Sequence, residues 1–305
     1  MSWMITDQSA DYLKVANPLH PAVQFFSSNG AILRTENDNV IVCAIGRVRS
    51  YNNDYLVVDD YSWLAALFDN EPLQVMHQLA GFFLIVIFNK RDNSVTVIND
   101  HVGSIPCYVD QRDATVLNIS DSIPALLAQN PATELNAQAL FNYVFYHCIP
   151  SPISVYQGIS KLEPGVIAKL TPNNIEQISY YQPDFSPSTD STDVLMRRCA
   201  ELISEAVRRN ITDDCAAFLS GGLDSSTVAG MLAKHSKPLG KSAKTYSIGF
   251  EAKGYDETEY ALLTANHFAT NHKVHYLQPD EIAEHFTQVA GYFDEPFGNS
   301  SAMAA

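Results

Sequence analysis

The sequence predicts two domains of different class, a strand-rich α+β domain built in layers and then an α/β domain with a parallel sheet. Two patterns along the 305 residues support this division. Over about the first 180 residues, short segments alternate apolar and polar side chains, which is typical of half-buried strands. After Thr192 the apolar residues recur at helical spacing, and strands then alternate with helices. That alternation predicts a parallel sheet with helices on both faces.

Turn residues such as Asn29-Gly30 separate the segments of the first domain. The segments expected to be strands are 40–44, 82–88, 95–98, 116–119 and 165–170, and those expected to be helices are 61–68, 123–128 and 136–145. A polar, proline-marked stretch at 182–190 is expected to link the two domains. The predicted domains are therefore 1–185 and 191–305.

The second domain begins with an expected amphipathic helix, in which apolar residues share one face. These residues are Leu195, Cys199, Leu202, Ile203 and Ala206. Strands are expected at 214–219, 244–250 and 272–277, with one helix after the first strand and another from a capping box at 256–259 through 268. A last helix is predicted from the apolar stripe Ile282, Phe286, Val289, Ala290 and Phe293.

The most informative segment is the glycine-rich run between the first of these strands and its helix, Ser220-Gly221-Gly222-Leu223-Asp224-Ser225-Ser226. A helix N-terminus offers unpaired N–H groups and positive potential, and adjacent glycines let a phosphate approach the backbone. Asp224 could cap the helix or face a magnesium ion. The run has neither the Lys-Ser/Thr ending of a Walker A loop nor the third glycine of a dinucleotide fingerprint. It predicts phosphate binding, and the plain alternative is a turn rich in small residues.

Composition narrows the function classes. A net charge of −15 argues against a nucleic-acid partner, which needs clustered Lys and Arg. The first ten residues have no basic region followed by an apolar core, and no apolar run approaches membrane-spanning length. The five cysteines are odd in number and widely spaced, so we expect reduced, mostly buried thiols in a cytoplasmic protein with no membrane partner.

Several ordered motifs of the second half resemble the synthetase domain of the asparagine synthetase family, a branch of the PP-loop ATP pyrophosphatases. They are FLSGGLDSS (218–226), TYSIGF (245–250), YDETEYA (255–261), the segment His272 to His275 and FDEPFGNSSA (293–302). The resemblance implies ATP and Mg²⁺ as cofactors, Ile248 against the adenine, and a tentative metal role for Asp224. Asp294 and Glu295 match an acidic pair and are tentative substrate-binding residues. The loop residues implied to bind the nucleotide are Leu219, Ser220, Gly221, Gly222, Asp224, Ser225 and Ser226.

The first half resembles the glutaminase domain of the same family through GFFLIVIFNKRDNSVTVINDHVGSIPCYV (81–109) and KLEPGVIAKL (161–170). The resemblance implies an Ntn-hydrolase-like layered sandwich before a doubly wound PP-loop sheet that is incomplete at the C-terminus. Asp60 falls where the family binds the ammonium group of glutamine. The family's N-terminal cysteine and its Asn-Gly-Glu are missing, because Ser2 follows Met1 and the chain reads Ile45-Gly46-Arg47. We therefore expect no glutaminase activity, although Ser2 is left open as a nucleophile.

The expected function is that of an ATP-dependent ligase which activates a small-molecule carboxylate and joins it to ammonia or an amine. Alternatives are an amide ligase of the β-lactam synthetase or peptide-cyclase type, and a non-catalytic nucleotide-binding scaffold. The family's second glycine-rich acidic loop is absent, so we expect a fragment or a naturally truncated chain, which could form a homodimer. Weaker site candidates are the pair His147 and Cys148, the pair Asp59 and Asp60, and the trio His267, His272 and His275, for which structural roles are favoured.

Overall fold

The chain divides into two compact units in a computed structural model that describes residues 13–16, 23–27, 32–50, 61–113, 116–131, 133–171, 174–250 and 257–299. The first unit comprises Met1–Asp184 together with Phe293–Asn299, and the second comprises Phe185–Tyr292 together with Ser300–Ala305. The domain bounds 1–185 and 191–305 stay a prediction. The compact units differ from them by placing Phe293–Asn299 with the first half of the chain.

The larger sheet of the first unit has six strands in the order β11-β10-β6-β5-β4-β3, and all neighbouring pairs are antiparallel. Its longest strands pair along their whole length, from Val40 opposite Asn89 to Ser50 opposite Leu79. The strands are β3 (Leu33–Glu36), β4 (Val40–Ser50), β5 (Leu79–Asn89), β6 (Val95–Asn99), β10 (Val166–Thr171) and β11 (Asn174–Ser179).

The smaller sheet has five strands in the order β1-β2-β8-β7-β9. The pair β2 and β8 is parallel, and the other neighbours are antiparallel. Its strands are β1 (Leu13–Ala16), β2 (Val23–Ser27), β7 (Tyr108–Asp110), β8 (Leu117–Ser120) and β9 (Ile159–Lys161).

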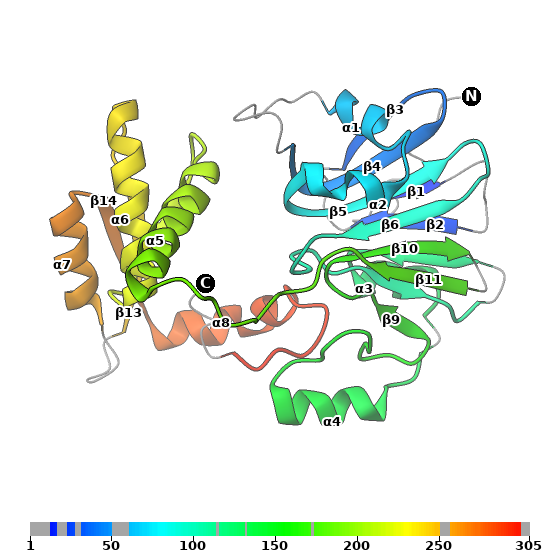
Figure 1. Cartoon of the computed structure of the whole chain (residues 1–305). Helices are drawn as coiled ribbons and strands as arrows, with labels where there is room; N and C mark the ends of the chain where they lie inside the picture. The colour runs from blue at the N-terminus through cyan, green and yellow to red at the C-terminus, as the bar shows by residue number, and fades with distance from the viewer. Residues whose placement is uncertain are drawn as a thin grey trace. The chain divides into compact units, whose positions relative to one another are not determined.

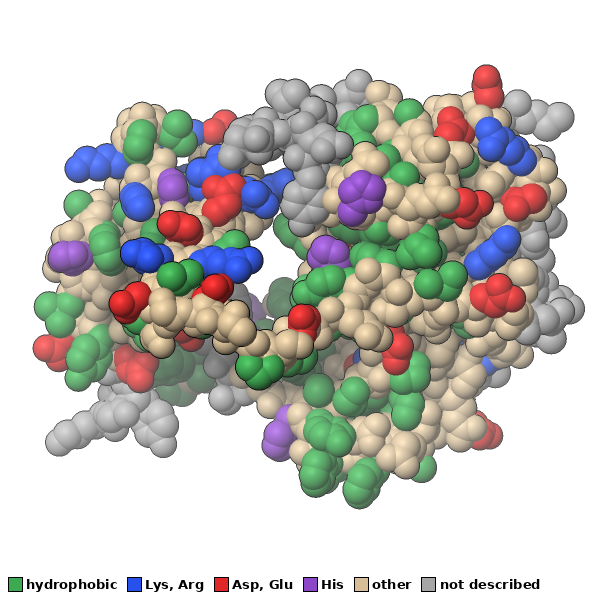
Figure 2. All heavy atoms as spheres, viewed as in Figure 1, with side chains coloured by type: hydrophobic (Ala, Val, Ile, Leu, Met, Phe, Trp, Pro, Cys, Tyr) green, Lys and Arg blue, Asp and Glu red, His purple; other side chains and the backbone are tan. Residues whose placement is uncertain are grey.

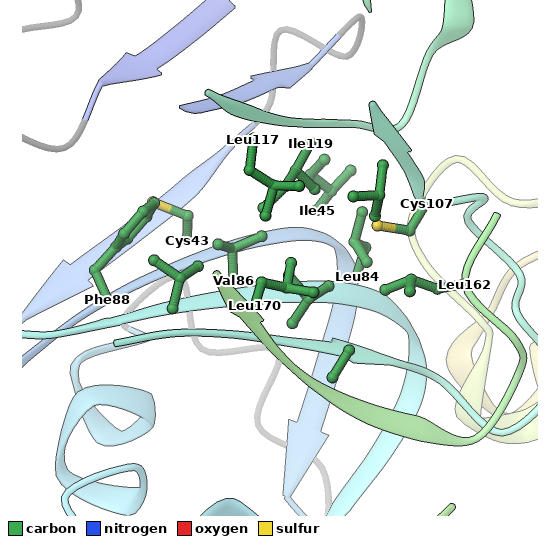
Figure 3. Close-up of a cluster of buried hydrophobic side chains, with 14 of the residues drawn as sticks. Cys43, Ile45, Leu84, Val86, Phe88, Cys107, Leu117, Ile119, Leu162 and Leu170 are labelled. Atoms are coloured by element: carbon green, nitrogen blue, oxygen red, sulfur yellow. The ribbon is translucent and has the colours of Figure 1, made fainter. Parts of the chain in front are cut away.

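Strand periodicity explains how these sheets stack, because successive side chains point to opposite faces. In β4, Ile45 joins a buried cluster that also contains Val86 of the larger sheet and Ile119 of the smaller one, so this core lies between the two sheets (Figure 3). On the opposite face of the larger sheet, Val42 shares a second cluster with Leu64. That helical side is formed by α1 (Ser62–Leu67), α2 (Pro72–Val75) and the 3₁₀ turn η1 (Met76–Gln78).

A third cluster covers the outer face of the smaller sheet, where Tyr108 packs with Leu126 and Ala139. Leu126 comes from helix α3 (Ile123–Gln129) and Ala139 from helix α4 (Ala137–Tyr146). The first unit is therefore a helix–sheet–sheet–helix arrangement (Figure 1). One face of α4 stays exposed and carries Phe141, Val144 and Phe145. Figure 2 shows hydrophobic side chains gathered where this helix lies.

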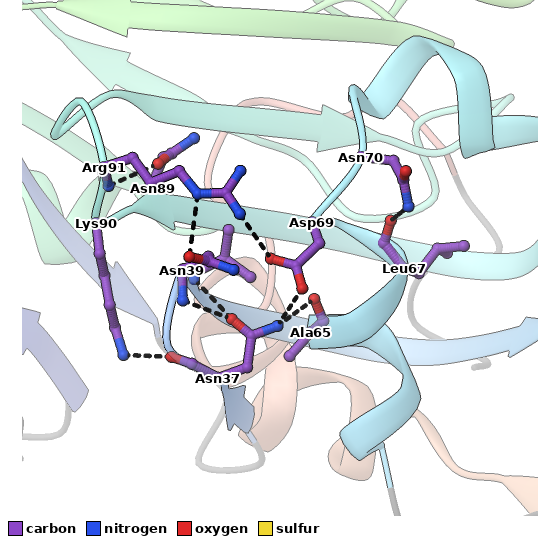
Figure 4. A network of polar contacts seen from close by, with 10 residues as sticks. Asn37, Asn39, Ala65, Leu67, Asp69, Asn70, Asn89, Lys90 and Arg91 are labelled. Atoms are coloured by element: carbon purple, nitrogen blue, oxygen red, sulfur yellow. Dashed lines mark hydrogen bonds and ion pairs between the residues drawn. The ribbon is translucent and has the colours of Figure 1, made fainter.

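Polar contacts join three turns at the edge of the larger sheet (Figure 4). The Asn37 side chain accepts from the N–H groups of Asn39 and Val40 and donates to the Ala65 carbonyl at 2.9 Å, which links the β3–β4 turn to α1. Lys90, in the turn after β5, donates to the Asn37 carbonyl at 2.6 Å. Such side-chain bonds supply partners for turn backbone that the sheet ladder leaves unpaired.

The second unit alternates helices with three parallel strands in the order β12-β13-β14. Within the residues that the structure describes, β12 is an edge strand of this sheet. Adjacent parallel strands are connected here by helices, as short parallel sheets require. The elements are α5 (Thr192–Arg209), β12 (Ala216–Phe218), α6 (Leu223–Ser236), the 3₁₀ turn η2 (Lys237–Leu239), β13 (Lys244–Phe250), α7 (Thr258–Phe268), β14 (Asn271–Leu277) and α8 (Pro279–Ala290).

The ends of two predicted helices needed correction. The helix predicted from the stripe Ile282 to Phe293 is α8, but it begins at Pro279 and ends at Ala290, so Phe293 lies outside it. Its capping box joins Gln278 and Glu281, a pair that the sequence reading missed. The box predicted at 256–259 includes residue 256, which lies outside the described ranges; the N-cap residue of α7 is Glu257, without a side-chain cap bond, and the helix begins at Thr258.

The cysteines follow the expectation of buried thiols only in part. Cys43 and Cys107 are buried in the core between the sheets, whereas Cys148 and Cys215 are partly exposed and Cys199 is exposed. Burial raises the pKa of the Cys43 thiol to about 12, and it raises the pKa of Cys107 as well. These two core thiols are therefore protonated and unreactive near neutral pH.

Candidate functional site

The glycine-rich run follows β12 after Leu219, and its last four residues form the first turn of α6, in the predicted order of strand, loop and helix. Leu219 anchors its start, because the side chain is 1% exposed and packs against Ala229 of α6 and Ala261 of α7. Its N–H donates to the Tyr246 carbonyl at 2.8 Å, which extends the pairing of β12 with β13 by one residue. The loop therefore leaves the sheet from a fixed point.

Serine hydroxyls fold the loop onto itself. The Ser220 N–H donates to the Ser225 Oγ at 3.2 Å, and the two serine Oγ atoms are 3.0 Å apart. The Gly222 N–H donates to the Ser220 Oγ at 3.3 Å. Ser226, by contrast, faces α7, where its Oγ is 3.3 Å from the Thr264 Oγ1. The Ser225 hydroxyl also donates to the Gly222 carbonyl at 3.2 Å, so Ser220 and Ser225 bond to each other and to the loop backbone.

The two glycines are needed for different reasons. Gly221 has a φ of +85°, and a Cβ on it would lie 2.5 Å from the Tyr260 Cβ and 2.7 Å from the Ala261 N. This glycine lets the loop turn tightly against α7. A Cβ on Gly222 would meet only the Ser220 Oγ, at 3.4 Å, so the space beside Gly222 is open. An approaching anion can reach the backbone at this second glycine.

Helix α6 gives the loop its electrostatic character. It runs for 14 residues from Leu223, and the first N–H groups of a helix have no partner within it. These groups and the helix dipole favour an anion at the loop. The carboxylate of Asp224 lies in the first turn of α6 and is exposed, in a position open to a cation or to water. A cradle of open backbone, two hydroxyls and one carboxylate fits a phosphate chain with its metal ion.

Ile248 lies on the neighbouring strand, at the level of Ser220, the first residue of the run. It is the fifth residue of β13 and is only partly buried. Since Phe218 pairs with Tyr246, Ile248 lies two residues farther toward the carboxyl end of the sheet. Ligands of open parallel sheets bind at this end of the strands. The structure thus places Ile248 and the loop at the same edge.

Asp294 and Glu295 lie in the first unit, and both carboxylates have protein partners there. Asp294 accepts from the Ser122 Oγ and the Ile123 N–H, each at 3.2 Å, and so caps α3. Glu295 accepts from the Val155 N–H at 2.9 Å and forms an ion pair with Lys161. Burial raises the pKa of Asp294, although its two hydrogen bonds oppose the change. The tentative substrate role of this pair stays a prediction.

The remaining candidates of the sequence reading are scattered or lie outside the described residues. Ser2, Asp59 and Asp60 fall in undescribed segments, so the structure gives no position for them. Ile45, at the position of the missing asparagine, is 1% exposed in the core between the sheets. His147 ends α4 in a left-handed conformation.

The three histidines of the second unit do not form a metal site. His267 contacts the ring of Phe268, His272 contacts two hydroxyls of β13, and His275 lies 3.3 Å from the Glu281 carboxylate. Across the described ranges, no group of three or more His, Cys, Asp and Glu side chains could hold a metal ion. The described helices also include none with the length and apolarity needed to cross a membrane.

Sequence reasoning missed two side chains beside the loop, Ser247 and Thr245. Both are buried in β13, and both contact the His272 ring. Their two-residue spacing puts them on one face of the strand, which was a usable signal. The pairing of Thr245 with His272 could not be predicted from the sequence, because it depends on the register of β13 with β14.

The fold therefore has two parts. The first unit contains two stacked sheets, and the second contains a parallel sheet whose strand β12 leads into the glycine-rich run. Comparison with family models gives the same two parts. Residues 51–181 match the glutamine amidotransferase domain, and residues 198–305 match asparagine synthase. The chain belongs to the asparagine synthase family, with the N-terminal amidotransferase domain followed by part of the synthase domain. This family uses ATP.

Individual relatives support the assignment. Asparagine synthetase [glutamine-hydrolyzing] 1 of Bacillus subtilis is 27% identical over 257 residues, which cover 83% of this chain and 39% of the relative. A protein of Methanocaldococcus jannaschii, provisionally named an asparagine synthetase, is 31% identical over 252 residues, 80% of this chain and 48% of the relative. The amidase chry2 of Gibberella zeae is 26% identical over 264 residues, 80% of this chain and 38% of the relative. The chain thus spans less than half the length of these relatives.

Proposed function

We propose that this chain binds ATP at Ser220 to Ser226 and belongs to an ATP-dependent, amide-forming ligase of the asparagine synthetase type. The observation that carries the proposal is the open backbone at Gly222, directly before the N-terminus of α6. An anion there meets N–H groups, the helix dipole and the hydroxyls of Ser220 and Ser225. In this proposal the parallel strands are the start of a doubly wound PP-loop sheet, and the first unit is an Ntn-hydrolase-like sandwich.

The proposal gives tasks to the loop backbone and to a few side chains. The N–H groups of the loop and of the first turn of α6 bind the pyrophosphate part of ATP, and Ile248 contacts the adenine. Asp224 would hold Mg²⁺, which neutralises phosphate charge when it is bound. The nucleotide activates a small-molecule carboxylate, which ammonia or an amine then attacks. Asp60, Asp294 and Glu295 are proposed to contact the substrates.

The nitrogen donor is proposed to be free ammonia or an amine rather than glutamine. The supporting observation is Ile45, whose hydrocarbon side chain is buried where the resemblance expects an asparagine. A hydrocarbon cannot donate the hydrogen bond that an oxyanion requires. We also propose a cytoplasmic protein that could pair as a homodimer.

A second candidate function is amide formation on a different acyl group, as in β-lactam synthetases or peptide cyclases. The supporting observation is that the similarity extends beyond asparagine synthetases, to a Gibberella zeae protein and a Penicillium rubens protein that are called amidases. The core chemistry of ATP binding is common to both candidates. Incubation with a panel of carboxylates and ATP, followed by detection of released pyrophosphate, separates them by the acid that is consumed.

The test of the shared proposal is ATP binding by isothermal titration with excess Mg²⁺, repeated with EDTA. Asp224→Asn should lower the affinity in Mg²⁺ and have little effect in EDTA, because only the metal-bound nucleotide needs the carboxylate. Asp280→Asn is the matched control, since Asp280 is also in the first turn of a helix of the same unit. Equal effects of the two substitutions, or no ATP binding at all, would refute the proposal; the latter would favour a scaffold without nucleotide.

A further inference from the structure

The carbonyl of Leu219 is the last backbone acceptor before the glycine loop, and a side chain of the next strand holds it. The Ser247 hydroxyl, on β13, donates to this carbonyl. Together with the bond from the Leu219 N–H to the Tyr246 carbonyl, it fixes both backbone groups of Leu219 against β13. Ser247 is 5% exposed, so solvent does not compete for its single proton.

An imidazole on the third strand contacts the same serine. The His272 Nε2 lies 3.3 Å from the Ser247 Oγ, and its Nδ1 lies 2.9 Å from the Thr245 Oγ1. Thr245, which is fully buried, is in turn 2.8 Å from the Thr270 Oγ1. A continuous chain of polar groups thus runs from the segment before β14, across β13, to the carbonyl that precedes the loop.

Counting protons gives this chain a direction. A serine hydroxyl can donate one hydrogen bond, and Ser247 donates it to the Leu219 carbonyl. The Ser247 Oγ must therefore accept a hydrogen bond from the His272 Nε2–H. In the neutral ring the Nδ1 then accepts a hydrogen bond from the Thr245 hydroxyl, whose oxygen accepts one from the Thr270 hydroxyl. Burial lowers the pKa of His272 and so favours this neutral ring. Every bond of the chain is satisfied in one tautomer.

We propose that Ser247 and His272 are positioning residues for the nucleotide loop, because their hydrogen bonds fix the carbonyl from which the loop leaves the sheet. The inference rests on the proposed ATP site. It goes beyond that site because it makes the geometry of the loop depend on His272, a side chain of β14 outside the glycine-rich run. Neither residue contacts the nucleotide in this proposal. Their effect is to hold Leu219 so that the open backbone at Gly222 keeps its position.

The experiment compares Ser247→Ala, Ser247→Thr, His272→Gln and His272→Asn in the full chain by titration with ATP and Mg²⁺. Ser247→Ala should weaken binding about two- to tenfold, the net effect of one hydrogen bond, and Ser247→Thr should restore it. The Gln amide nitrogen can replace the His272 Nε2, whereas the Asn amide nitrogen matches the Nδ1. We therefore expect His272→Gln to keep more affinity than His272→Asn. Ser242→Ala is the control, since the Ser242 hydroxyl donates to the Ala269 carbonyl at 3.3 Å, outside the chain of bonds to Leu219.

A readout without ligand separates this inference from the proposed function. Nitrogen-15 NMR of the His272 ring should show the Nε2–H tautomer, and the amide protons from Ser220 to Leu223 should exchange faster in Ser247→Ala but not in Ser242→Ala. If the wild type does not bind ATP but these amides respond, the proposed function fails and the positioning role stands. Unchanged loop exchange in a folded Ser247→Ala protein, or the Nδ1–H tautomer, would overturn the inference. If Ser247→Ala does not fold, equal affinity of His272→Gln and His272→Asn would overturn it.

Discussion

Replacing each loop glycine by alanine should separate folding from phosphate binding. The two positions are adjacent, yet their surroundings differ. Alanine at 221 must adopt the left-handed region, at a φ of +85°, and must place its Cβ 2.5 to 2.7 Å from atoms of Tyr260 and Ala261. Alanine at 222 keeps an ordinary extended conformation, with φ −70° and ψ 166°, and meets one atom at 3.4 Å.

These contacts set the expected magnitudes. For Gly221→Ala, the left-handed conformation costs about 1–2 kcal/mol, and overpacking against the helix costs a further 1–3 kcal/mol or so. The free energy of unfolding of the second unit should therefore fall by about 2–5 kcal/mol, which lowers its melting temperature by about 8 °C or more. For Gly222→Ala the unfolded chain loses entropy, so stability should be unchanged or rise by about 0.4–1 kcal/mol.

Nucleotide affinity should change in the opposite order. The Cβ of Gly222→Ala projects into the space that a phosphate would occupy, and loss of one charge-assisted hydrogen bond lowers affinity about tenfold or more. Calorimetric melting without nucleotide measures the first effect, and titration with ATP and Mg²⁺ at a temperature where both variants are folded measures the second. Equal destabilisation by the two substitutions, or full affinity in Gly222→Ala, would refute this reading of the loop.

Three further predictions concern the rest of the chain. The protein should release no glutamate from glutamine above the blank, because buried Ile45 cannot act as an oxyanion donor; turnover that disappears in Ser2→Ala would contradict this. Asp294→Asn should change the pH dependence of the free energy of unfolding. The raised pKa means that folded Asp294 binds its proton more tightly than unfolded Asp294. The stability that Asp294 contributes is therefore fully present below pH 3.8 and is lost as the pH rises through the raised pKa. Urea unfolding across this range should show a decline in wild type that is smaller in Asp294→Asn. Finally, α5 and α8 have no buried residue, and Met196, Leu202 and Phe286 are each more than 60% exposed; sedimentation should show concentration-dependent association that Leu202→Lys reduces, and an unchanged profile would mean that this surface is not involved.

Elements with strong periodicity could be predicted from the sequence. Strands β4, β5 and β6 lie where alternation placed them, although β4 extends to Ser50, beyond the predicted 40–44, and β5 extends from Leu79 to Asn89, beyond the predicted 82–88. The structure also has the amphipathic helix from Thr192 that was predicted. Strands β1, β2, β3 and β11 were not predicted. Strands β7 and β9 were missed as well, because three residues are too few for a pattern to emerge. They exist because neighbouring strands of the smaller sheet pair with them.

The loop of the candidate site was predictable, whereas its supports were not. Adjacent glycines between a strand and a helix are a local signal, and the structure has them in that context. The contact between Ser122 and Asp294 joins residues 172 positions apart, and no local pattern encodes such a distance. The same holds for His272 and Ser247, whose contact depends on how two strands align.

The segment Phe293–Asn299 has a consequence for any attempt to divide the protein. The polypeptide leaves the first unit after Asp184 and returns to it at Phe293, so neither unit is one continuous stretch of sequence. A protease cut in the linker would yield two fragments that stay associated, because the later fragment carries the cap of α3 and the carboxylate that pairs with Lys161. The first 184 residues expressed alone would lack both, and a synthetic peptide of residues 293–299 should bind to them by fragment complementation.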